Sequence, residues 1–360
     1  MSELYIGVMS GTSLDGIDVA LCEIDSKNCK LISAQEYPFD KELKKEILDV
    51  IDGFTTLKEI GTIDKKLGTA FAHAVSRFVR EKELNAENIT AIGLHGQTLW
   101  HEPNAEFSFS MQLGCSSTVV AKTGIQVVSD FRSMDLANGG QGAPFAPAFH
   151  QFAFKNQDKK TAVLNIGGMA NVTLLGKKLQ GWDTGCGNVL MDMWISKCQN
   201  LAYDKEGEFA KSGSVNEELL NAMLEDNYFK KLPPKSTGRE YFNETWFASH
   251  LPIFNSIKDA DIQRTLLELT ALSIANDLKN RGLELVVVCG GGAKNSFLMQ
   301  RIQELTHLEV KPSDAFGMSS EFMEAMAFAW LAYKRVHKEQ VALSQVTGSV
   351  KNSILGAIYG

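Results

Sequence analysis

The segment YIGVMSGTSLDGIDVAL, residues 5–21, consists of two apolar stretches joined by a loop of hydroxyl groups, glycines and aspartates. After the loop, apolar residues at positions 17, 19 and 21 alternate with residues 18, 20 and 22. Alternation with a period of two predicts a strand with one buried face. The segment is therefore expected to form a β-hairpin with an unusually polar loop.

The loop composition allows two interpretations. The simpler one is a polar hairpin turn. The other is a phosphate-binding loop, because glycines let backbone N–H groups approach an anion and hydroxyl groups add donors. Aspartates repel phosphate unless a metal ion or ordered water lies between them, so the loop fits a magnesium nucleotide better than bare phosphate.

The second half of the chain repeats this plan. TAVLNIGGMANVTLL, residues 161–175, reads as strand, glycine-rich loop and strand, and LVVVCGGGAKNSFLMQRIQEL, residues 285–305, as strand, triple glycine and helix. Apolar residues at helical spacing predict further helices over 41–52 and 63–84. Two such hairpins in a chain of 360 residues predict two α/β domains facing a cleft, with a break near residue 130.

Other nucleotide-binding and hydrolytic motifs are missing or incomplete. GxxxxGK[ST] is absent, and GCGNVL and GGGAKN approach GxGxxG without completing it. Neither GxSxG nor HExxH occurs, which argues against an α/β-hydrolase and a zinc protease. The remaining architecture is that of actin and the sugar kinases, in which two related domains each offer a hairpin to the phosphates.

Composition excludes several classes of partner. The net charge of −7 argues against binding to nucleic acid or an anionic membrane. No stretch of about 18 apolar residues suggests a membrane span, and the first residues lack the basic region of a signal peptide. Six cysteines without CxxC spacing are expected to be reduced thiols, neither disulfides nor zinc ligands. A cytoplasmic protein is predicted.

Seven segments, in order, carry a resemblance to a known family: GVMSGTSLDGIDVAL, GLHGQT, SDFRSMDLANGGQGAP, NIGGMANVT, WDTGCGN, GGGAKN and EAMAFAWLA. Across nearly its whole length the chain resembles the anhydro-N-acetylmuramic acid kinases. The resemblance implies a two-domain actin-like ATPase fold of the ribonuclease H type. It also implies ATP-dependent opening of 1,6-anhydro-N-acetylmuramic acid and phosphorylation of O6, giving N-acetylmuramic acid 6-phosphate and ADP in peptidoglycan recycling.

The family also implies a domain plan and a homodimer. Residues 1–130 are expected to form an N-terminal lobe with the first phosphate hairpin. Residues 131–360 are expected to form a C-terminal lobe with the second hairpin, the catalytic aspartate and an adenosine loop. The C-terminal strand is compatible with either lobe.

The resemblance assigns catalysis to two carboxylates. Asp183, in WDTGCGN, matches the family's general base, which activates the water that attacks the anomeric carbon. A helix N-cap is the alternative role for an aspartate before a helix. Glu324 begins an otherwise apolar helix and is expected to be buried, where it binds the sugar or positions the water. Cys186 stands where the family usually has proline, so we expect a slightly more flexible turn and not a nucleophilic thiol.

The nucleotide and the sugar are assigned to separate loops. The phosphate loop comprises Gly11, Thr12, Ser13, Leu14, Asp15, Gly16, Ile17 and Asp18, with Asp15 and Asp18 binding Mg²⁺ directly or through water. The second phosphate contact comprises Gly167, Gly168 and Asn171, and the adenosine contact comprises Gly290, Gly291 and Gly292. Each glycine has the alternative role of forming a turn.

The sugar is assigned to His95, Gln97, Thr98 and Arg132. The guanidinium group of Arg132 matches the lactyl carboxylate as a fork; a surface salt bridge is its alternative role.

Two other functions share the fold: an ATP-driven scaffold or chaperone of the actin and Hsp70 kind, and a non-catalytic sugar sensor.

Overall fold

The computed structural model describes residues 2–11, 14, 16–53, 55–155, 157–250 and 257–360. The chain divides into two compact units: unit 1 is Met1–Ala153 with Phe322–Gly360, and unit 2 is Phe154–Glu321. Among the helices described, none is long and apolar enough to cross a membrane.

Unit 1 is built on a mixed sheet. Its strands are β1 (Glu3–Met9), β2 (Gly16–Ile24), β3 (Cys29–Pro38), β4 (Ile89–Leu94), β7 (Val127–Ser129) and β13 (Ala357–Tyr359). They lie in the order β13-β7-β4-β1-β2-β3. The pairs β1–β2, β2–β3 and β7–β13 are antiparallel, and β1–β4 and β4–β7 are parallel. A separate antiparallel ribbon joins β5 (Gln97–Glu102) to β6 (Phe109–Leu113).

Helices cover both faces of this sheet. They are α1 (Lys41–Asp52), α2 (Leu57–Glu81), α3 (Ser116–Thr123), α4 (Ser133–Ala137), α5 (Ala146–Ala153), α13 (Met323–Val336) and α14 (Ser344–Thr347). Helix α2 begins earlier than the predicted residue 63, because Thr56 and Glu59 form a capping box. The Glu59 N–H donates to Thr56 Oγ1 (3.2 Å) and the Thr56 N–H donates to the Glu59 carboxylate (2.7 Å).

Unit 2 holds a five-stranded sheet and most of the remaining helices. The strands are β8 (Thr161–Ile166), β9 (Met169–Leu174), β10 (Gln180–Cys186), β11 (Leu285–Cys289) and β12 (Glu309–Pro312), in the order β10-β9-β8-β11-β12. The helices are α6 (Val189–Gln199), α7 (Glu208–Ser212), α8 (Glu217–Leu224), α9 (Asn227–Lys230), α10 (Glu244–Ala248), α11 (Asp259–Leu278) and α12 (Ser296–Thr306).

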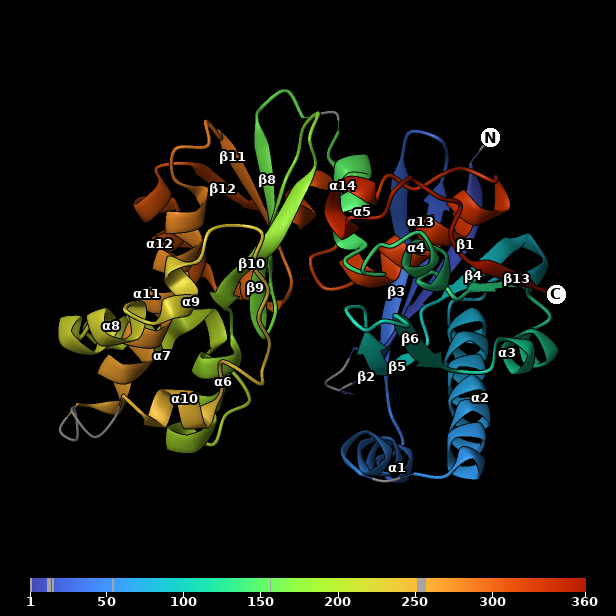
Figure 1. Cartoon of the computed structure of the whole chain (residues 1–360), viewed down its shortest axis with the longest axis horizontal. Helices are drawn as coiled ribbons and strands as arrows, with labels where there is room; N and C mark the ends of the chain where they lie inside the picture. Colours follow the sequence, from blue (N-terminus) through green and yellow to red (C-terminus); the bar gives the residue numbers. More distant parts are fainter. Residues whose placement is uncertain (1, 12–13, 15, 54, 156, 251–256) are drawn as a thin grey trace. The chain divides into compact units, whose positions relative to one another are not determined.

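The two sheets share one topology. In unit 1 the order β3-β2-β1-β4-β7 joins an antiparallel meander to two parallel strands, and in unit 2 the order β10-β9-β8-β11-β12 does the same. The glycine-rich hairpin loops occupy equivalent positions between the first two strands of each sheet. This duplicated arrangement is that of the actin-like ATPases and confirms the predicted fold class, and each sheet can be followed in Figure 1.

The units do not divide where the sequence suggested. The expected break near residue 130 lies inside unit 1, which continues to Ala153. Residues 322–360, assigned to the C-terminal lobe, also belong to unit 1. The reason is burial: α13 packs across β1, β2 and β4, and β13 adds to β7 (Figure 1).

Strand β2 is buried on both faces, not on one. Ile17, Val19 and Leu21 lie in a core that also contains residues of α1 and α2. Ala20 and Cys22, on the opposite face, are equally inaccessible because α13 covers them. The apolar–polar alternation missed this second layer because small residues form it.

Two glycines allow α13 to approach the sheet. A Cβ atom at Gly7 would lie 1.8 Å from the carbonyl oxygen of Ala325, and one at Gly93 would lie 2.0 Å from that of Phe328. Gly7 and Gly93 are register partners on β1 and β4. The pair forms a shallow groove in which the helix backbone contacts the sheet.

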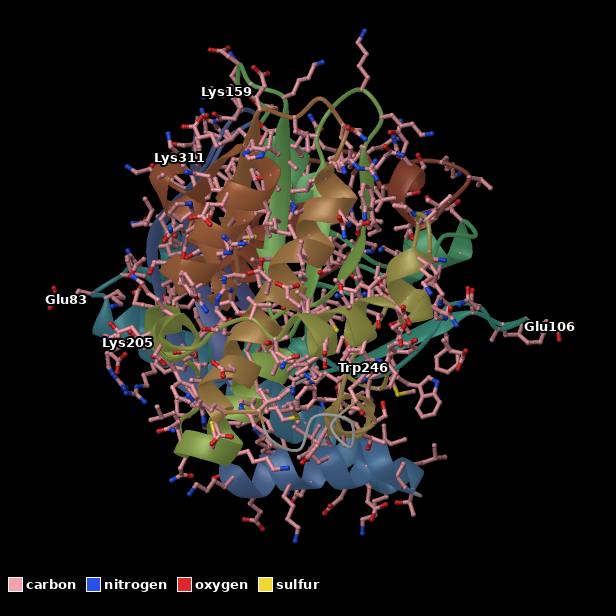
Figure 2. All side chains as sticks on the ribbon, turned by 90° about the vertical axis from the view of Figure 1, so that its left-hand side faces the viewer. Glu83, Glu106, Lys159, Lys205, Trp246 and Lys311 are labelled. Carbon is pink, nitrogen blue, oxygen red and sulfur yellow. The ribbon has the colours of Figure 1, made fainter. Side chains whose placement is uncertain are left out.

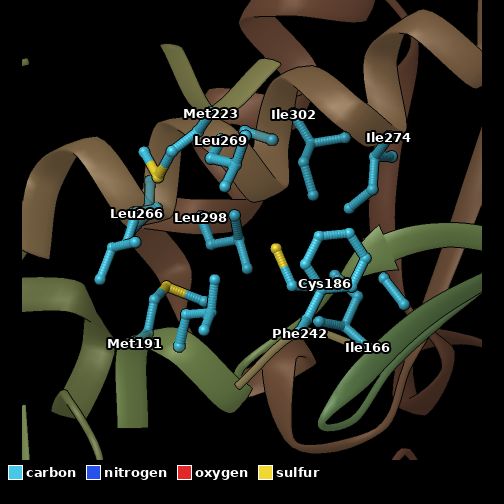
Figure 3. Packing of buried hydrophobic residues seen from close by; sticks show 14 of the residues in the cluster. Ile166, Cys186, Met191, Met223, Phe242, Leu266, Leu269, Ile274, Leu298 and Ile302 are labelled. Atoms are coloured by element: carbon cyan, nitrogen blue, oxygen red, sulfur yellow. The ribbon is translucent and has the colours of Figure 1, made fainter. Parts of the chain in front are cut away.

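The core of unit 2 lies between its sheet and helices α6, α8, α11 and α12. Figure 3 shows the thiol of Cys186 among Ile166, Phe242 and aliphatic side chains of these helices. Burial raises the pKa of this thiol to about 12, so Cys186 acts as a small apolar residue and not as a nucleophile. Its backbone ends β10 in register with Met169, and its carbonyl accepts from Thr270 Oγ1 (3.2 Å).

The edge strand β12 is protected by charge. Glu309 pairs with Lys159, and its carboxylate lies 2.5 Å from Lys311 Nζ. Figure 2 shows Lys159 and Lys311 at the same end of unit 2. Charged side chains and the proline that ends the strand discourage edge-to-edge pairing with another chain.

Gly7→Ala is expected to lower the free energy of unfolding by about 1–3 kcal/mol or more, because the added methyl group meets helix backbone that cannot move aside. The matched control is Gly61→Ala in α2, where no atom lies within 4 Å of the added Cβ. This control should gain about 0.5–1 kcal/mol. Urea unfolding followed by circular dichroism measures both; equal midpoints for the two variants would contradict the close approach of α13.

Candidate functional site

The first hairpin loop is described in part. Thr12, Ser13 and Asp15 lie outside the described residues. The Leu14 N–H donates to the Gly11 carbonyl (3.1 Å), and the Leu14 side chain is fully buried. Leu14 therefore anchors the loop in the core of unit 1, and any contact it makes with a ligand comes from its backbone.

The rest of the loop prediction falls on β2. Gly16 begins the strand, and the side chain of Ile17 is buried in the core. Asp18 is half-buried and stands between Met9 on β1 and Glu36 on β3, in register with both. Residues directly opposite on neighbouring strands share a face, so two carboxylates lie side by side there. Carboxylate oxygens are the ligands that Mg²⁺ prefers.

His95 and Arg132 contact each other in unit 1. Arg132 Nη2 lies 2.8 Å from His95 Nε2, and Arg132 Nη1 donates to the Gly142 carbonyl (2.9 Å). Because a guanidinium group has no acceptor, His95 must accept at Nε2 and carry its proton on Nδ1. Burial, and secondly the charge of Arg132, lower the pKa of His95 to about 3. The imidazole is neutral at physiological pH.

Arg132 has a buried hydrogen-bond donor that no described residue accepts. Burial lowers its pKa to about 10, and Glu324 opposes that shift, so the group stays charged at neutral pH. Its Nε is buried and has no hydrogen-bond partner among the described residues. An unsatisfied buried donor costs about 1–3 kcal/mol. An incoming acceptor such as a carboxylate would remove that cost.

Gln97 joins the same group, whereas Thr98 points into the β5–β6 ribbon. Gln97 is fully buried, and its Oε1 accepts from Ser10 Oγ (2.5 Å), which ties β5 to the first loop. Thr98 Oγ1 accepts from Gln112 Nε2 (3.2 Å). We call Ser10, His95, Gln97, Arg132 and Glu324 the unit 1 polar group.

Glu324 is placed beside this group by α13, but it is not buried as the sequence suggested. The side chain is exposed in the first turn of the helix. Enough protein surrounds it that desolvation raises its pKa, while the charge of Arg132 lowers it. One turn later, the ring of Phe328 lies 4.6 Å from that of His95. The carboxylate is therefore accessible to a ligand near Arg132.

Asp183 lies within β10 and does not cap a helix. Helix α6 begins after Asn188, which is its N-cap. The Asp183 N–H donates to the Lys235 carbonyl (3.0 Å), and the Asp183 carbonyl accepts from Tyr228 Oη (2.9 Å). Its carboxylate accepts from the Thr237 N–H (2.9 Å). The N-cap alternative is thus wrong, and the carboxylate is held by a segment far along the chain.

The strand register places other polar side chains beside Asp183. Asp183 pairs with Asn171 on β9, which pairs with Asn165 on β8. Directly opposite residues share a face, so these three side chains form a row across the sheet. The row lies on the face opposite Trp182 and Leu164, which point into the core of unit 2.

Desolvation sets the basicity of Asp183. Burial raises its pKa to about 6, the Thr237 hydrogen bond and Lys235 lower it, and Glu240 raises it. Lys235 itself is buried and lies 3.1 Å from Asp277 Oδ2. A carboxylate with a pKa near 6 is a stronger base than a free aspartate and is still ionised at neutral pH.

The predicted glycine contacts gather around the end of β8. The carbonyl groups of Gly167 and Gly168 accept from the N–H groups of residues 187–189 at 2.8–3.1 Å. A Cβ at Gly290 would lie 2.6 Å from the Ile166 carbonyl oxygen, and one at Gly292 would lie 2.4 Å from the Ile166 side chain. Gly291 has room for a Cβ, with its nearest neighbour at 3.6 Å, the Asn188 amide. Two of the three glycines thus have a packing role.

The sequence reasoning missed the partners of Asp183. Lys235 and Thr237 lie in PPKSTGREYF, residues 233–242, a segment whose prolines, hydroxyls and glycine signal a turn. Asn165 lies in NIGGMANVT, where only the glycines and Asn171 were selected. We call Asn165, Asn171, Asp183, Lys235 and Thr237 the unit 2 polar group.

Comparison with known proteins gives a consistent result. Residues 3–360 match the family described as anhydro-N-acetylmuramic acid kinase. Proteins of that name from Sulfurimonas denitrificans and Sulfurovum sp. are 57% and 54% identical to this chain, with 100% and 99% of both chains covered. The (R)-2-hydroxyglutaryl-CoA dehydratase component A of Acidaminococcus fermentans is similar in fold, with a TM-score of 0.51, 12% identity, and coverage of 93% of this chain and 100% of that one.

Asp183→Asn should stabilise unit 2 above pH 6. Because the folded pKa of about 6 lies above the unfolded value of 3.8, stability is fully present below the unfolded value and is lost as pH rises towards 6. The amide removes this loss and keeps an acceptor for Thr237. Urea unfolding at pH 4, 6 and 8 measures the difference, and the exposed Asp158→Asn is the control. A gap between variant and wild type that does not grow with pH would contradict the raised pKa.

Proposed function

The chain belongs to the anhydro-N-acetylmuramic acid kinase family, and we propose that it uses ATP to convert 1,6-anhydro-N-acetylmuramic acid to N-acetylmuramic acid 6-phosphate. The observation that carries this reaction is the ionised, partly desolvated carboxylate of Asp183, held by Thr237 in a row with Asn171. Peptidoglycan recycling is the process that would supply such a sugar. The scaffold and sensor alternatives do not fit a chain that matches a kinase family from residue 3 to residue 360.

The reaction makes one demand on a base. Asp183 takes a proton from water as the water oxygen bonds to the anomeric carbon and the bond from that carbon to O6 breaks. O6 then bonds to the γ-phosphorus, and the bond from that phosphorus to the ADP oxygen breaks. The hydrogen bond from Thr237 fixes one carboxylate oxygen, which leaves the other to face the water.

The sugar is assigned to the unit 1 polar group. Arg132 binds the lactyl carboxylate through its unsatisfied Nε and a second N–H of its guanidinium group. The neutral His95 holds Arg132 in place without adding a competing negative charge. Glu324 accepts a sugar hydroxyl or positions the attacking water, since its carboxylate is accessible.

The phosphates are assigned to backbone groups of the two hairpin loops. Bound Mg²⁺ would neutralise charge on the phosphates, and Asp18, half-buried on β2, is the described residue that fits it. Gly167 and Gly168 carry no side chains of their own, so their backbone can approach a phosphate closely. The family's homodimer remains a prediction for this chain.

ADP release from ATP should depend on the anhydro sugar and match the sugar phosphate formed. Asp183→Asn should lower kcat by about 10²–10⁴-fold, while ATP and sugar still bind.

For the wild type, kcat/KM should rise with pH to a plateau above an apparent pKa of about 6, because the base acts when ionised. A coupled ADP assay and calorimetry measure these; ATP turnover indifferent to any sugar would remove the proposed reaction.

Arg132→Lys should raise KM for the sugar, because an ammonium group cannot form the two-pronged contact with a carboxylate. The matched ligand is 1,6-anhydro-N-acetylglucosamine, which lacks the lactyl group. The variant and the wild type should use this control sugar about equally well. Equal losses on both sugars would show that Arg132 supports the fold instead of reading the carboxylate.

A further inference from the structure

The segment that holds Asp183 also carries an arginine. Its Lys235 carbonyl and Thr237 N–H bond to Asp183, and Lys235 is itself fixed by a buried ion pair with Asp277. Arg239 follows two residues after Thr237. Its position is thus fixed relative to the proposed base by a short, well-anchored stretch of chain.

The guanidinium group of Arg239 lies against the Gly167–Gly168 turn. A Cβ atom at Gly168 would stand 3.4 Å from both Nε and Nη2 of Arg239. The contact is made by the planar group itself and not by its aliphatic stem. A cation therefore lies directly over the Gly167–Gly168 turn, whose carbonyl groups bond to residues 187–189 at the start of α6.

The charge of Arg239 is not neutralised by a close partner. The side chain is exposed, and within the described part of the chain it forms no ion pair with a carboxylate inside 4 Å. Arg239 interacts electrostatically with Asp192 on α6. Burial raises the pKa of Asp192 to about 6, and the positive charge of Arg239 limits that rise. The five donors of the guanidinium group are thus available to an anion.

The turn beneath Arg239 does not repel an anion with its carbonyl groups. The carbonyl oxygens of Gly167 and Gly168 are occupied by the N–H groups of residues 187–189, where α6 begins. The turn therefore offers a surface without a side chain, and Arg239 supplies positive charge above it. This combination suits a tetrahedral, highly charged group better than a neutral ligand.

We propose that Arg239 binds the phosphoryl group during its transfer from ATP to O6, an inference that rests on the proposed function. As the phosphorus passes between the two oxygens, negative charge lies on its equatorial oxygens, and a fork of N–H donors stabilises it. Arg239 keeps its protons throughout; the only bonds to phosphorus that change are those to the ADP oxygen and to O6.

The contrasting role is structural: Arg239 packs on the turn and offsets the charge of Asp192. A structural arginine would lose stability when removed, but added guanidinium ion would not restore activity. A phosphate-binding arginine should show a kcat effect without a change in the KM for the sugar. It should also matter for a nucleotide with a γ-phosphate and not for ADP.

The experiment compares Arg239→Ala, Arg239→Lys and the control Arg281→Ala. Arg281 is an exposed arginine of unit 2 whose guanidinium group stacks on Trp182 (4.4 Å to the ring centroid). Arg239→Ala should lower kcat by about 10²-fold or more, and Arg239→Lys should lose less because it keeps the charge. The control should keep wild-type kcat. Calorimetry should show weaker binding of the non-hydrolysable analogue AMPPNP to Arg239→Ala and unchanged binding of ADP.

Added guanidinium ion should restore part of the activity of Arg239→Ala and none to Arg281→Ala. If Arg239→Ala is poorly folded, Arg239→Lys supplies the same kcat and AMPPNP comparison. Variants of Arg239 that keep wild-type kcat, or that lose activity without guanidinium rescue and without a selective loss of AMPPNP binding, overturn the role of Arg239. In that case sugar-dependent turnover by the wild type still supports the kinase; its absence would instead remove the proposed function.

Discussion

Helix α13 touches the backbone of the unit 1 sheet, and the polar group of that unit depends on this contact. Only a groove of glycine at positions 7 and 93 leaves space for the helix carbonyl groups. At this depth, the first turn of α13 sets Glu324 near Arg132, and the next turn packs Phe328 on His95. Residues from both ends of the sequence thus lie close together because Gly7 and Gly93 have no side chains.

In unit 2 the corresponding constraint is electrostatic. Desolvation destabilises the charged form of Asp183 and so raises its pKa. The Thr237 N–H and the Lys235 ammonium group stabilise that form and limit the rise. The result is a carboxylate that is more basic than a free aspartate and still ionised at neutral pH. Lys235 performs two tasks there, since its carbonyl holds the strand and its side chain is locked against Asp277.

Local patterns made much of this architecture predictable. The hairpin over residues 5–21, the glycine turn near Gly167 and the motif around Asp183 are short-range features, so alternation and spacing predict them. Long-range packing is not encoded so plainly: Thr237 reaches Asp183 across 54 positions, and residues 322–360 return to unit 1 through a groove of small side chains. The exposure of Glu324 could not be predicted from the sequence, because the apolar composition of a helix does not show which of its ends is exposed to solvent.

The shared strand order of the two sheets assigns the same place to two unlike loops. His95 and Gln97 follow the fourth strand of one sheet, and Gly290 to Gly292 follow the fourth strand of the other. The unit 1 sheet has polar side chains at this position, whereas the unit 2 sheet has glycines, which have no side chains. Under the proposed function, substitutions at His95 and Gln97 would change contacts to the sugar while the glycine-lined loops of the other sheet keep their sequence.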